Sequence, residues 1–201
     1  MVHLKSPTIT HLQGNRIDLL DSLPKKSVCA ELGVFCGDFS AEILKHCQPK
    51  RLYLVDIFSG KIYSGDADGN HVHEAFMPEV RWDLEVRFRS KPVSVVASDS
   101  IGWLTDQKMD SLDWCYIDTS HEYERTAGEL IAARGAVADH GFICGHDYHK
   151  IFPGVVQAVN YFCAYHDLTL EVFDGDKLPS YRILNRKNQS AEQPLGSERL
   201  P

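Results

Sequence analysis

The chain has 201 residues, a length typical of one domain with a substantial core, and its composition of 43% hydrophobic and 24% charged residues is that of an ordinary globular protein. A formal net charge of −7, with no run of Lys or Arg, argues against a nucleic-acid-binding surface. No apolar stretch approaches the roughly 20 residues that a membrane-spanning helix requires.

The N-terminal sequence MVHLKSPTITHLQ lacks the apolar core of a signal peptide. The six cysteines lie mostly inside apolar segments and form no C-x-x-C pair. We therefore expect reduced core residues rather than disulfides or a zinc site. These features predict a cytoplasmic protein whose partner is a small molecule rather than nucleic acid or membrane, and they leave open whether it forms a homodimer.

Strands and helices are predicted to alternate along the chain. Apolar runs bounded by turn residues predict strands, and apolar residues at helical spacing predict helices. In chain order, we predict a helix over 15–23, a strand over 28–32, a helix over 39–47, strands over 51–55, 93–97 and 112–117, a helix over 122–134, a strand over 142–145, a helix over 155–165, and a hairpin of strands over 168–173 and 181–184.

This order predicts an α/β fold: a single Rossmann-like domain with a mostly parallel seven-stranded sheet, helices on both faces and a C-terminal antiparallel hairpin. We place the domain at 1–185 and a flexible polar tail at 186–201. The segment 59–92 is longer than a crossover connection requires, so it is either a lid or substrate wall, or a surface helix with a mobile leader. We expect its first residues to be mobile and the remainder to be mostly helical, with a break near Pro78.

The turn after the first strand contains an acidic residue and two glycines, in the sequence ELGVFCGDFS. A turn of this kind holds a nucleotide-like ligand at the carboxyl end of a parallel strand. Its acidic residue would repel a pyrophosphate but could accept hydrogen bonds from an ammonium group. S-adenosylmethionine, which has an amino-acid end, therefore fits better than a dinucleotide. The predicted contacts come from Glu31, Gly33, Phe35, Gly37 and Ser40.

Acidic residues also follow the second and third strands. Asp56 lies 25 positions after Glu31, and we expect it to accept hydrogen bonds from both ribose hydroxyls. Asp99 and Ser100 would lie near the adenine ring. The sequence Ser-Asp-Ser is also typical of a helix N-cap, which is the alternative interpretation. A row of carboxylates at one edge of the sheet indicates a polar or cationic ligand there.

The densest group of reactive residues lies in WCYIDTSHEY (114–123) and GFICGHDYH (141–149). Asp118 and Asp147 end strands that should be neighbours, with His121 close in sequence to the first. Carboxylates favour Mg²⁺, Ca²⁺ or Mn²⁺, and imidazole favours Zn²⁺ or another transition metal. A metal there could lower the pKa of a substrate hydroxyl, and His121 could act as the general base.

Over about residues 28–165 the chain resembles class I S-adenosylmethionine-dependent methyltransferases. The segments IDTSHEY, GFICGHDY and GVVQAVNYF resemble those of the small metal-dependent family of sugar and catechol-type O-methyltransferases with Ile-Asp-Gly-x-His-x-Tyr and Gly-x-Asp-Asp-Tyr motifs. The resemblance implies methyl transfer to a hydroxyl group.

The resemblance also assigns roles to individual residues. It implies metal ligands at Asp118, His146 and Asp147, with Mg²⁺ or Mn²⁺ as the first candidates and Zn²⁺ as an alternative. It implies a general base at His121, and it makes Asp118 a catalytic and cofactor-contacting residue as well. The chain departs from the family pattern in two places: Thr119 replaces a glycine, and His146 stands where an acid or amide is common.

The predicted function is O-methylation of a hydroxyl on a sugar or natural-product type of small molecule, with S-adenosylmethionine, a divalent metal and a histidine base. One alternative is a metal-independent methyltransferase that acts on another small acceptor. Others are a nicotinamide-dependent oxidoreductase and a non-catalytic cofactor-binding protein on the same type of sheet. The absence of Gly-x-Gly and the presence of Glu31 count against the oxidoreductase.

Overall fold

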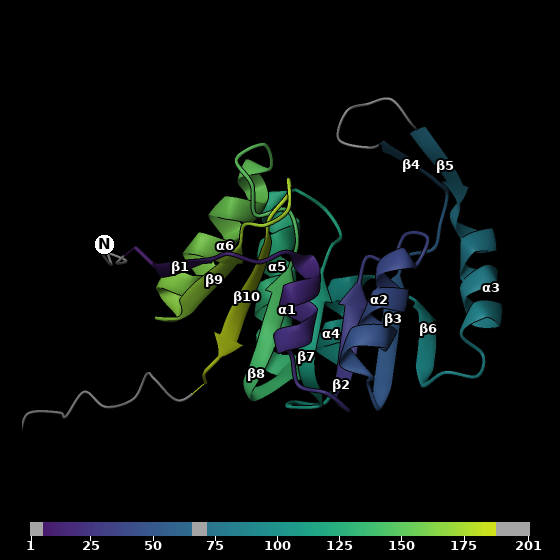
Figure 1. Cartoon of the computed structure of the whole chain (residues 1–201), viewed down its shortest axis with the longest axis horizontal. Helices are drawn as coiled ribbons and strands as arrows, with labels where there is room; N and C mark the ends of the chain where they lie inside the picture. Colours follow the sequence, from purple (N-terminus) through teal and green to yellow (C-terminus); the bar gives the residue numbers. More distant parts are fainter. Residues whose placement is uncertain (1–5, 66–71, 188–201) are drawn as a thin grey trace, which may run out of the picture.

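A sheet of eight strands runs through the centre of the molecule, and the computed structural model describes residues 6–65 and 72–187 (Figure 1). The strands are β1 (Thr8–Leu12), β2 (Val28–Leu32), β3 (Arg51–Asp56), β6 (Val93–Ala97), β7 (Leu112–Ile117), β8 (Val137–Gly145), β9 (Thr169–Phe173) and β10 (Ser180–Asn185). Their order across the sheet is β1-β9-β10-β8-β7-β2-β3-β6. Because β8, β7, β2, β3 and β6 are parallel, their carboxyl ends lie at one edge.

The predicted α/β class is confirmed, since β10 runs antiparallel to both β8 and β9 and closes the mostly parallel sheet with a hairpin. The sheet nevertheless has one strand more than the seven predicted. The additional strand, β1, pairs in parallel with β9 at the edge. Its residues are almost all exposed, so it lacks the apolar alternation by which strands are recognised.

Helices cover both faces of the sheet (Figure 1). One face carries two helices that contact each other, and the helix between β3 and β6, described below, adds residues to the same half of the core; the other face carries a layer of three. The first pair is α1 (Arg16–Ser22) and α2 (Asp38–Cys47), and the layer of three is α4 (Ser100–Asp106), α5 (Tyr123–Ala136) and α6 (Pro153–Tyr165).

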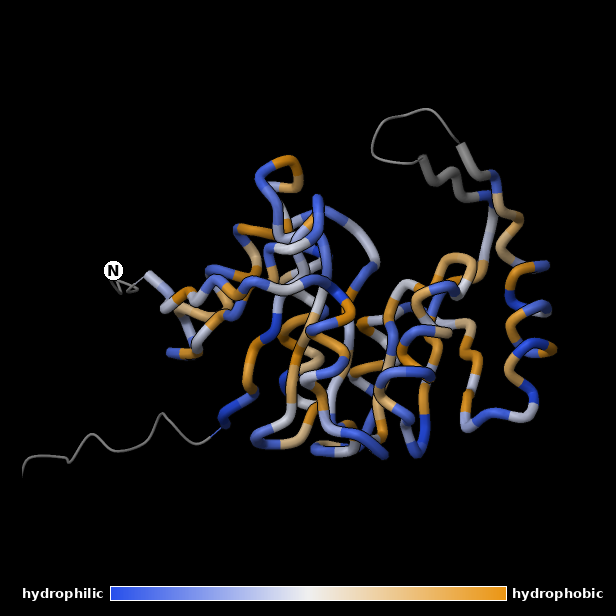
Figure 2. Tube along the Cα trace, viewed as in Figure 1, coloured by the Kyte–Doolittle hydropathy of each residue, from blue (hydrophilic) through white to orange (hydrophobic). Residues whose placement is uncertain are grey.

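The sheet divides the hydrophobic core into two halves. Along β7, Trp114 and Tyr116 pack on the side of α1 and α2, whereas Cys115 and Ile117 pack on the side of α5 and α6. This alternation follows from the two-residue period of a strand. Figure 2 accordingly shows hydrophobic residues concentrated along the central strands.

The segment between β3 and β6 contains a small antiparallel sheet and a helix. β4 (Lys61–Gly65) pairs with β5 (Val72–Phe76), and α3 (Met77–Arg87) follows directly. The prediction of a mostly helical second part is therefore correct for α3 and wrong for β5. Pro78 lies in the first turn of α3, where a missing N–H breaks no helical hydrogen bond, so it begins the helix instead of interrupting it.

Other sequence predictions concern cysteines, membrane spans and the termini. All six cysteines are free thiols, and all but Cys36 are buried. Among the described residues, no helix is long and apolar enough to cross a membrane. Most of the predicted tail lies outside the described residues, as do residues 66–71, which include the last five residues of the Gly/Asp-rich stretch.

Candidate functional site

The carboxyl ends of the parallel strands open into a cleft of about 760 Å³. In open α/β sheets this edge is where ligands bind. Ten of the residues singled out from the sequence line it together, namely Glu31, Gly33, Phe35, Gly37, Asp56, Ser100, Asp118, His121, His146 and Asp147. Ser40 and Asp99 stand behind this lining and contact residues that form it.

The turn after β2 depends on glycine at two positions. Gly33 has φ +83°, and a Cβ atom there would lie 2.0 Å from the backbone oxygen of Asp118. Gly37 is the left-handed N-cap of α2 and touches Arg87 of α3, which donates hydrogen bonds to the carbonyls of Cys36 and Gly37. The turn therefore packs closely against the residue that follows β7 on one side and is hydrogen-bonded to α3 on the other.

Replacing Gly33 with alanine should destabilise the fold by roughly 2–4 kcal/mol, because it combines a positive φ with a backbone clash. Gly60 is the matched control, since it has φ +72° but a Cβ atom added there would meet no other atom within 4 Å. Gly60→Ala should cost only the conformational part, about 1–2 kcal/mol. Urea unfolding of both variants gives the two values, and equal losses would contradict the clash.

Glu31 is fully buried at the end of β2, and its Oε2 accepts a hydrogen bond of 2.5 Å from Ser40 Oγ in α2. Burial raises the pKa of Glu31 to about 8, although Ser40 and Arg16 oppose this rise. A carboxyl group with this pKa is mostly protonated at neutral pH. A cation placed beside it would favour the ionised form.

Asp56 ends β3 and holds the neighbouring loops with both carboxylate oxygens. Its Oδ2 accepts a 2.9 Å hydrogen bond from the N–H of Val34, and its Oδ1 accepts one of 2.9 Å from Phe58. A carboxylate has about four acceptor positions, so two remain for a ligand. Phe35, which has a left-handed φ of +48°, lines the cleft beside this loop.

The residues after β6 form a partly buried polar network that extends into α5. Asp99 is the N-cap of α4, as its sequence context allowed, and it also pairs with Arg125 Nη1 at 2.5 Å. Ser100 Oγ hydrogen-bonds Glu129 and accepts from Arg125 Nη2 at 2.5 Å. Thr119 donates to both oxygens of Glu129. The network thus ties the loop after β6 to the loop after β7.

Asp118 ends β7 between two basic side chains. Arg16 Nη2 donates to its Oδ2 at 2.6 Å, and His146 Nδ1 lies 3.9 Å from its Oδ1. Arg16 comes from α1, on a part of the chain more than 100 positions away, and it also lines the cleft. Arg16 is not among the residues predicted from the sequence. The sequence around α1 does not indicate that this side chain reaches the end of β7.

Asp147 follows β8 with a left-handed φ of +61° and is nearly buried. Its Oδ1 lies 3.0 Å from His146 Nδ1 but has no hydrogen bond in the described structure. Burial raises the pKa of Asp147, but its contacts with His146 and His121 outweigh burial and lower the pKa below its ordinary value. Asp147 is therefore a carboxylate with one buried oxygen that contacts His146 but accepts no hydrogen bond from the described residues.

Asp118, His146 and Asp147 offer ligand atoms that all lie within 4.8 Å of one another. A small cavity of about 10 Å³ adjoins these residues, which is room for about one water molecule or ion. The buried Asp147 oxygen without a hydrogen bond and this cavity fit a divalent cation. His149, which also lies in the second motif, is not part of this group.

His121 stands at the mouth of the cleft, with about half of its side chain exposed. Its Nε2 contacts Asp147 Oδ2 at 2.9 Å, and its ring stacks on Phe152 with the centroids 3.7 Å apart. A carboxylate fixes the orientation of the imidazole and stabilises its protonated form. This pair of residues can accept a proton from a ligand in the cleft.

Comparisons with known proteins match the site-bearing part of the chain. A family model described as a methyltransferase domain matches residues 30–148. The solved structure of the N-methyltransferase NodS from Bradyrhizobium japonicum is similar, with a TM-score of 0.57, 17% identity, and coverage of 86% of this chain and 95% of that one. No curated protein matches the chain.

Two further solved structures share the fold at low identity. Precorrin-6y C5,15-methyltransferase from Geobacter metallireducens has a TM-score of 0.58 at 14% identity, covering 85% of this chain and 87% of that one. SMU.1697c from Streptococcus mutans, solved in complex with SAH (S-adenosylhomocysteine), has a TM-score of 0.57 at 12% identity, covering 84% of this chain and 94% of that one.

Proposed function

The chain belongs to the methyltransferase domain family and is an S-adenosylmethionine-dependent enzyme, and we propose that it methylates a hydroxyl group on a small molecule of the sugar or natural-product type. The observation that carries this proposal is the His121–Asp147 pair, which lies beside Asp118 at the cleft. A histidine held by a carboxylate suits an acceptor that must lose a proton, as a hydroxyl does.

We propose that the cofactor lies across the carboxyl ends of β2, β3 and β6. Its ammonium group would lie near Glu31, the ribose would bind Asp56, and the adenine would lie near Ser100. Three features support this placement: the buried carboxyl of Glu31, the free acceptor positions of Asp56 and the cleft that joins them. Asp99 and Ser40 would act indirectly, through Arg125 and Glu31 respectively.

The transfer itself requires the acceptor oxygen, the methyl carbon and the sulfur to lie in line. A bond forms between the oxygen and the methyl carbon, and the carbon–sulfur bond breaks, which leaves a neutral thioether. The proton of the hydroxyl passes to His121, and Asp147 stabilises the imidazolium ion that results. His121 would therefore begin each turnover neutral.

Asp118, His146 and Asp147 would hold a divalent cation, which when bound supplies a Lewis acid that lowers the pKa of the acceptor hydroxyl. Two carboxylates favour Mg²⁺ or Mn²⁺, and the imidazole makes Zn²⁺ an alternative. Metal-independent transfer is the second candidate, favoured by the 2.6 Å contact in which Arg16 already places a positive charge against Asp118.

We further propose that residues 1–185 act as one methyltransferase domain, and that the segment 59–92 forms one wall of the acceptor site. Arg87 of α3 donates hydrogen bonds to the turn after β2, and Ser59 lines the cleft. The segment is therefore adjacent to the site. Substrate specificity would then depend on residues that face the cleft from this wall.

A screen with methyl-labelled S-adenosylmethionine tests the proposed acceptor class. Sugars, catechols and small carboxylic acids are incubated with the protein, with Mg²⁺, Mn²⁺ or Zn²⁺ or with a chelator. We expect label on a hydroxyl oxygen of a sugar or phenol and a loss of activity with the chelator. Label on nitrogen or on a carboxylic acid would contradict the proposal, and unchanged activity with the chelator would favour the metal-independent candidate.

The binding of the cofactor product SAH should release protons near pH 7. In the free protein Glu31 has a pKa of about 8 and is mostly protonated, and the ammonium group of the ligand favours its ionised form. Affinity should therefore rise as pH rises toward 8. Calorimetry in two buffers of different ionisation enthalpy measures the protons released.

Glu31→Gln is the control for this prediction, and it should abolish the proton release. The same residue also affects stability without ligand: since its folded pKa is raised, its contribution to stability is fully present below its ordinary pKa and is lost as pH rises through about 8. Equal proton release by the wild type and Glu31→Gln would contradict a role for this carboxyl.

A further inference from the structure

Arg16 is a cation of the cleft to which the proposed metal-dependent transfer gives no role. Two arginines, Arg16 and Arg125, line the cleft. Arg125 is matched by carboxylates, since it pairs with Asp99 at 2.5 Å and with Glu129 at 3.2 Å. Among the described residues, the Arg16 side chain hydrogen-bonds only Asp118, although a guanidinium carries five N–H donors.

The Arg16 side chain is held firmly. Its guanidinium carbon lies 3.4 Å from the centroid of the Phe39 ring and 4.8 Å from that of Tyr116, so two aromatic rings hold the group in place. Its Nε atom is shielded from solvent and has no hydrogen-bond partner among the described residues. A buried donor without a partner costs free energy, so an acceptor supplied by a ligand would be favoured there.

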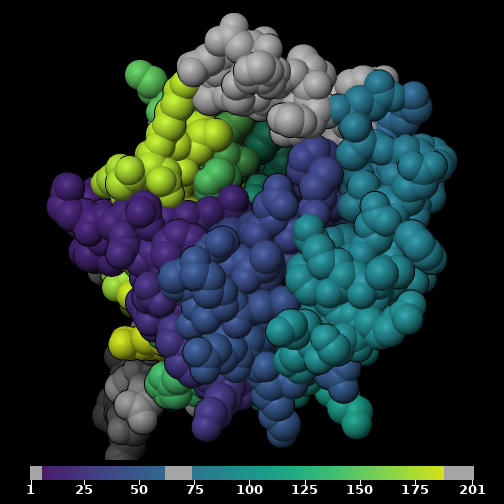
Figure 3. All heavy atoms as spheres, turned by 45° about the vertical axis from the view of Figure 1, so that its right-hand side comes forward, coloured from purple at the N-terminus to yellow at the C-terminus, as the bar shows by residue number. Residues whose placement is uncertain are grey.

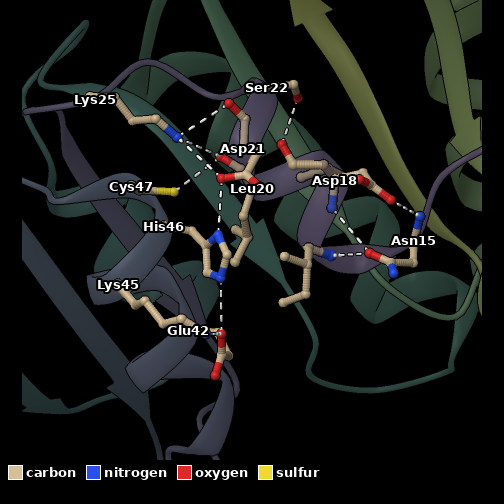
Figure 4. Close-up of polar contacts among 12 residues, drawn as sticks. Asn15, Asp18, Leu20, Asp21, Ser22, Lys25, Glu42, Lys45, His46 and Cys47 are labelled. Carbon is tan, nitrogen blue, oxygen red and sulfur yellow. Dashed lines mark hydrogen bonds and ion pairs between the residues drawn. The ribbon is translucent and has the colours of Figure 1, made fainter.

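The helix that carries Arg16 is anchored at both ends. Asn15 and Asp18 form a capping box at its start, and His46 of α2 contacts Asp21 at 2.9 Å near its end (Figure 4). The backbone N–H of Arg16 also donates to Asp176 at 2.7 Å, in the loop before β10. Figure 3 shows the N-terminal segment lying between α2 and the C-terminal strands on the surface. This anchoring fixes the position of Arg16 before a ligand binds.

The charges around Arg16 indicate the chemistry of the ligand. Glu31 and Asp118 lie close enough to affect it electrostatically, so the site alternates acidic and basic groups within a short distance. An ammonium ion alone would match the carboxyls but would be repelled by the guanidinium. A zwitterionic amino-acid end, with an ammonium and a carboxylate on one carbon, matches both. Arginine binds carboxylates through paired N–H donors.

We propose that Arg16 binds the α-carboxylate of the methionyl end of the cofactor, and so selects the intact amino acid over analogues that lack it. This inference rests on the proposed position of the cofactor. Asp118 keeps the guanidinium in place through Nη2, while the remaining donors face the carboxylate. Arg16 is then a residue that determines ligand specificity, and it lies outside the glycine-containing motif that follows β2.

Calorimetry with three ligands tests the proposal: SAH, its decarboxylated analogue, which keeps the amine, and 5′-methylthioadenosine, which lacks the whole amino-acid end. Arg16→Met should weaken SAH binding about 10- to 100-fold, the loss expected for a charged hydrogen-bonded pair. Arg16→Lys should weaken SAH binding less than Arg16→Met does, because lysine keeps the positive charge. Binding of 5′-methylthioadenosine should change less than about twofold. The control Arg51→Met, which removes an exposed arginine at the start of β3, should change the binding of neither ligand.

Wild-type protein gives an independent test that needs no variant to fold. It should bind decarboxylated SAH more weakly than SAH by about the factor lost in Arg16→Met. Equal affinity for these two ligands, or an equal loss of SAH and 5′-methylthioadenosine binding in Arg16→Met, would overturn the role of Arg16 and leave the proposed function standing. If the wild type bound none of the three ligands, the proposed cofactor position itself would fail.

Discussion

Replacing His121 with glutamine is expected to lower kcat by about 10²- to 10⁴-fold, the usual contribution of a general base. Glutamine can keep a hydrogen bond to Asp147, whose Oδ2 lies 2.9 Å from His121 Nε2, but it cannot take the proton of the acceptor hydroxyl. The affinity for SAH should stay the same, because we place the imidazole on the acceptor side of the cleft. Steady-state kinetics with a labelled methyl donor, together with calorimetry, measure both quantities.

Two controls separate catalysis from folding in this experiment. His166→Gln changes a histidine at the end of α6, which is not among the residues lining the cleft, and it should leave kcat unchanged. A rise in pH should partly restore His121→Gln, since hydroxide then deprotonates the acceptor. If His121→Gln retained wild-type turnover, another group would have to be the base.

Asp147→Asn is expected to have the second large effect, on both turnover and metal binding. The substitution removes the charge that stabilises protonated His121, and it removes the negative charge from an oxygen that accepts no hydrogen bond from the described residues. We expect metal affinity to fall by at least about 10- to 100-fold and kcat to fall by about 10²-fold or more. Asparagine also tolerates the φ of +61° at this position, so the backbone should be retained.

Titration with Mn²⁺, followed by calorimetry, measures the metal affinity of the wild type and Asp147→Asn. Asp106→Asn, an exposed residue at the end of α4, is the matched control and should bind the metal like the wild type. Tight binding that persists in Asp147→Asn would place the cation elsewhere. Lost turnover without any metal binding in the wild type would leave Asp147 as the partner of His121 alone.

The alternation of strands and helices can be predicted because each central strand is an apolar run between turn residues. β7 illustrates this, since its residues are buried on both faces of the sheet. β1 cannot be predicted in the same way, because its side chains are exposed and it is held by backbone pairing with β9. The short helix α4 is also absent from the predicted elements, although the sequence around Asp99 does indicate N-cap chemistry.

The candidate site can be predicted where it depends on strand ends. Parallel strands bring their carboxyl ends to one edge, so Glu31, Asp56 and Asp118 are expected together, and all three line the cleft. Arg16 and Glu129 cannot be found in this way, because neither lies at a strand end. Their positions depend on how α1 and α5 pack, which a single sequence does not reveal.

Above all, the cleft is expected to bind S-adenosylmethionine through the turn after β2. Thermal unfolding with SAH and with NAD⁺ tests this binding most directly. A ligand that binds only the folded state at 100 times its Kd stabilises that state by about 2.7 kcal/mol. We expect SAH to raise Tm and NAD⁺ to leave it unchanged. A rise with NAD⁺ and none with SAH would contradict the proposed cofactor.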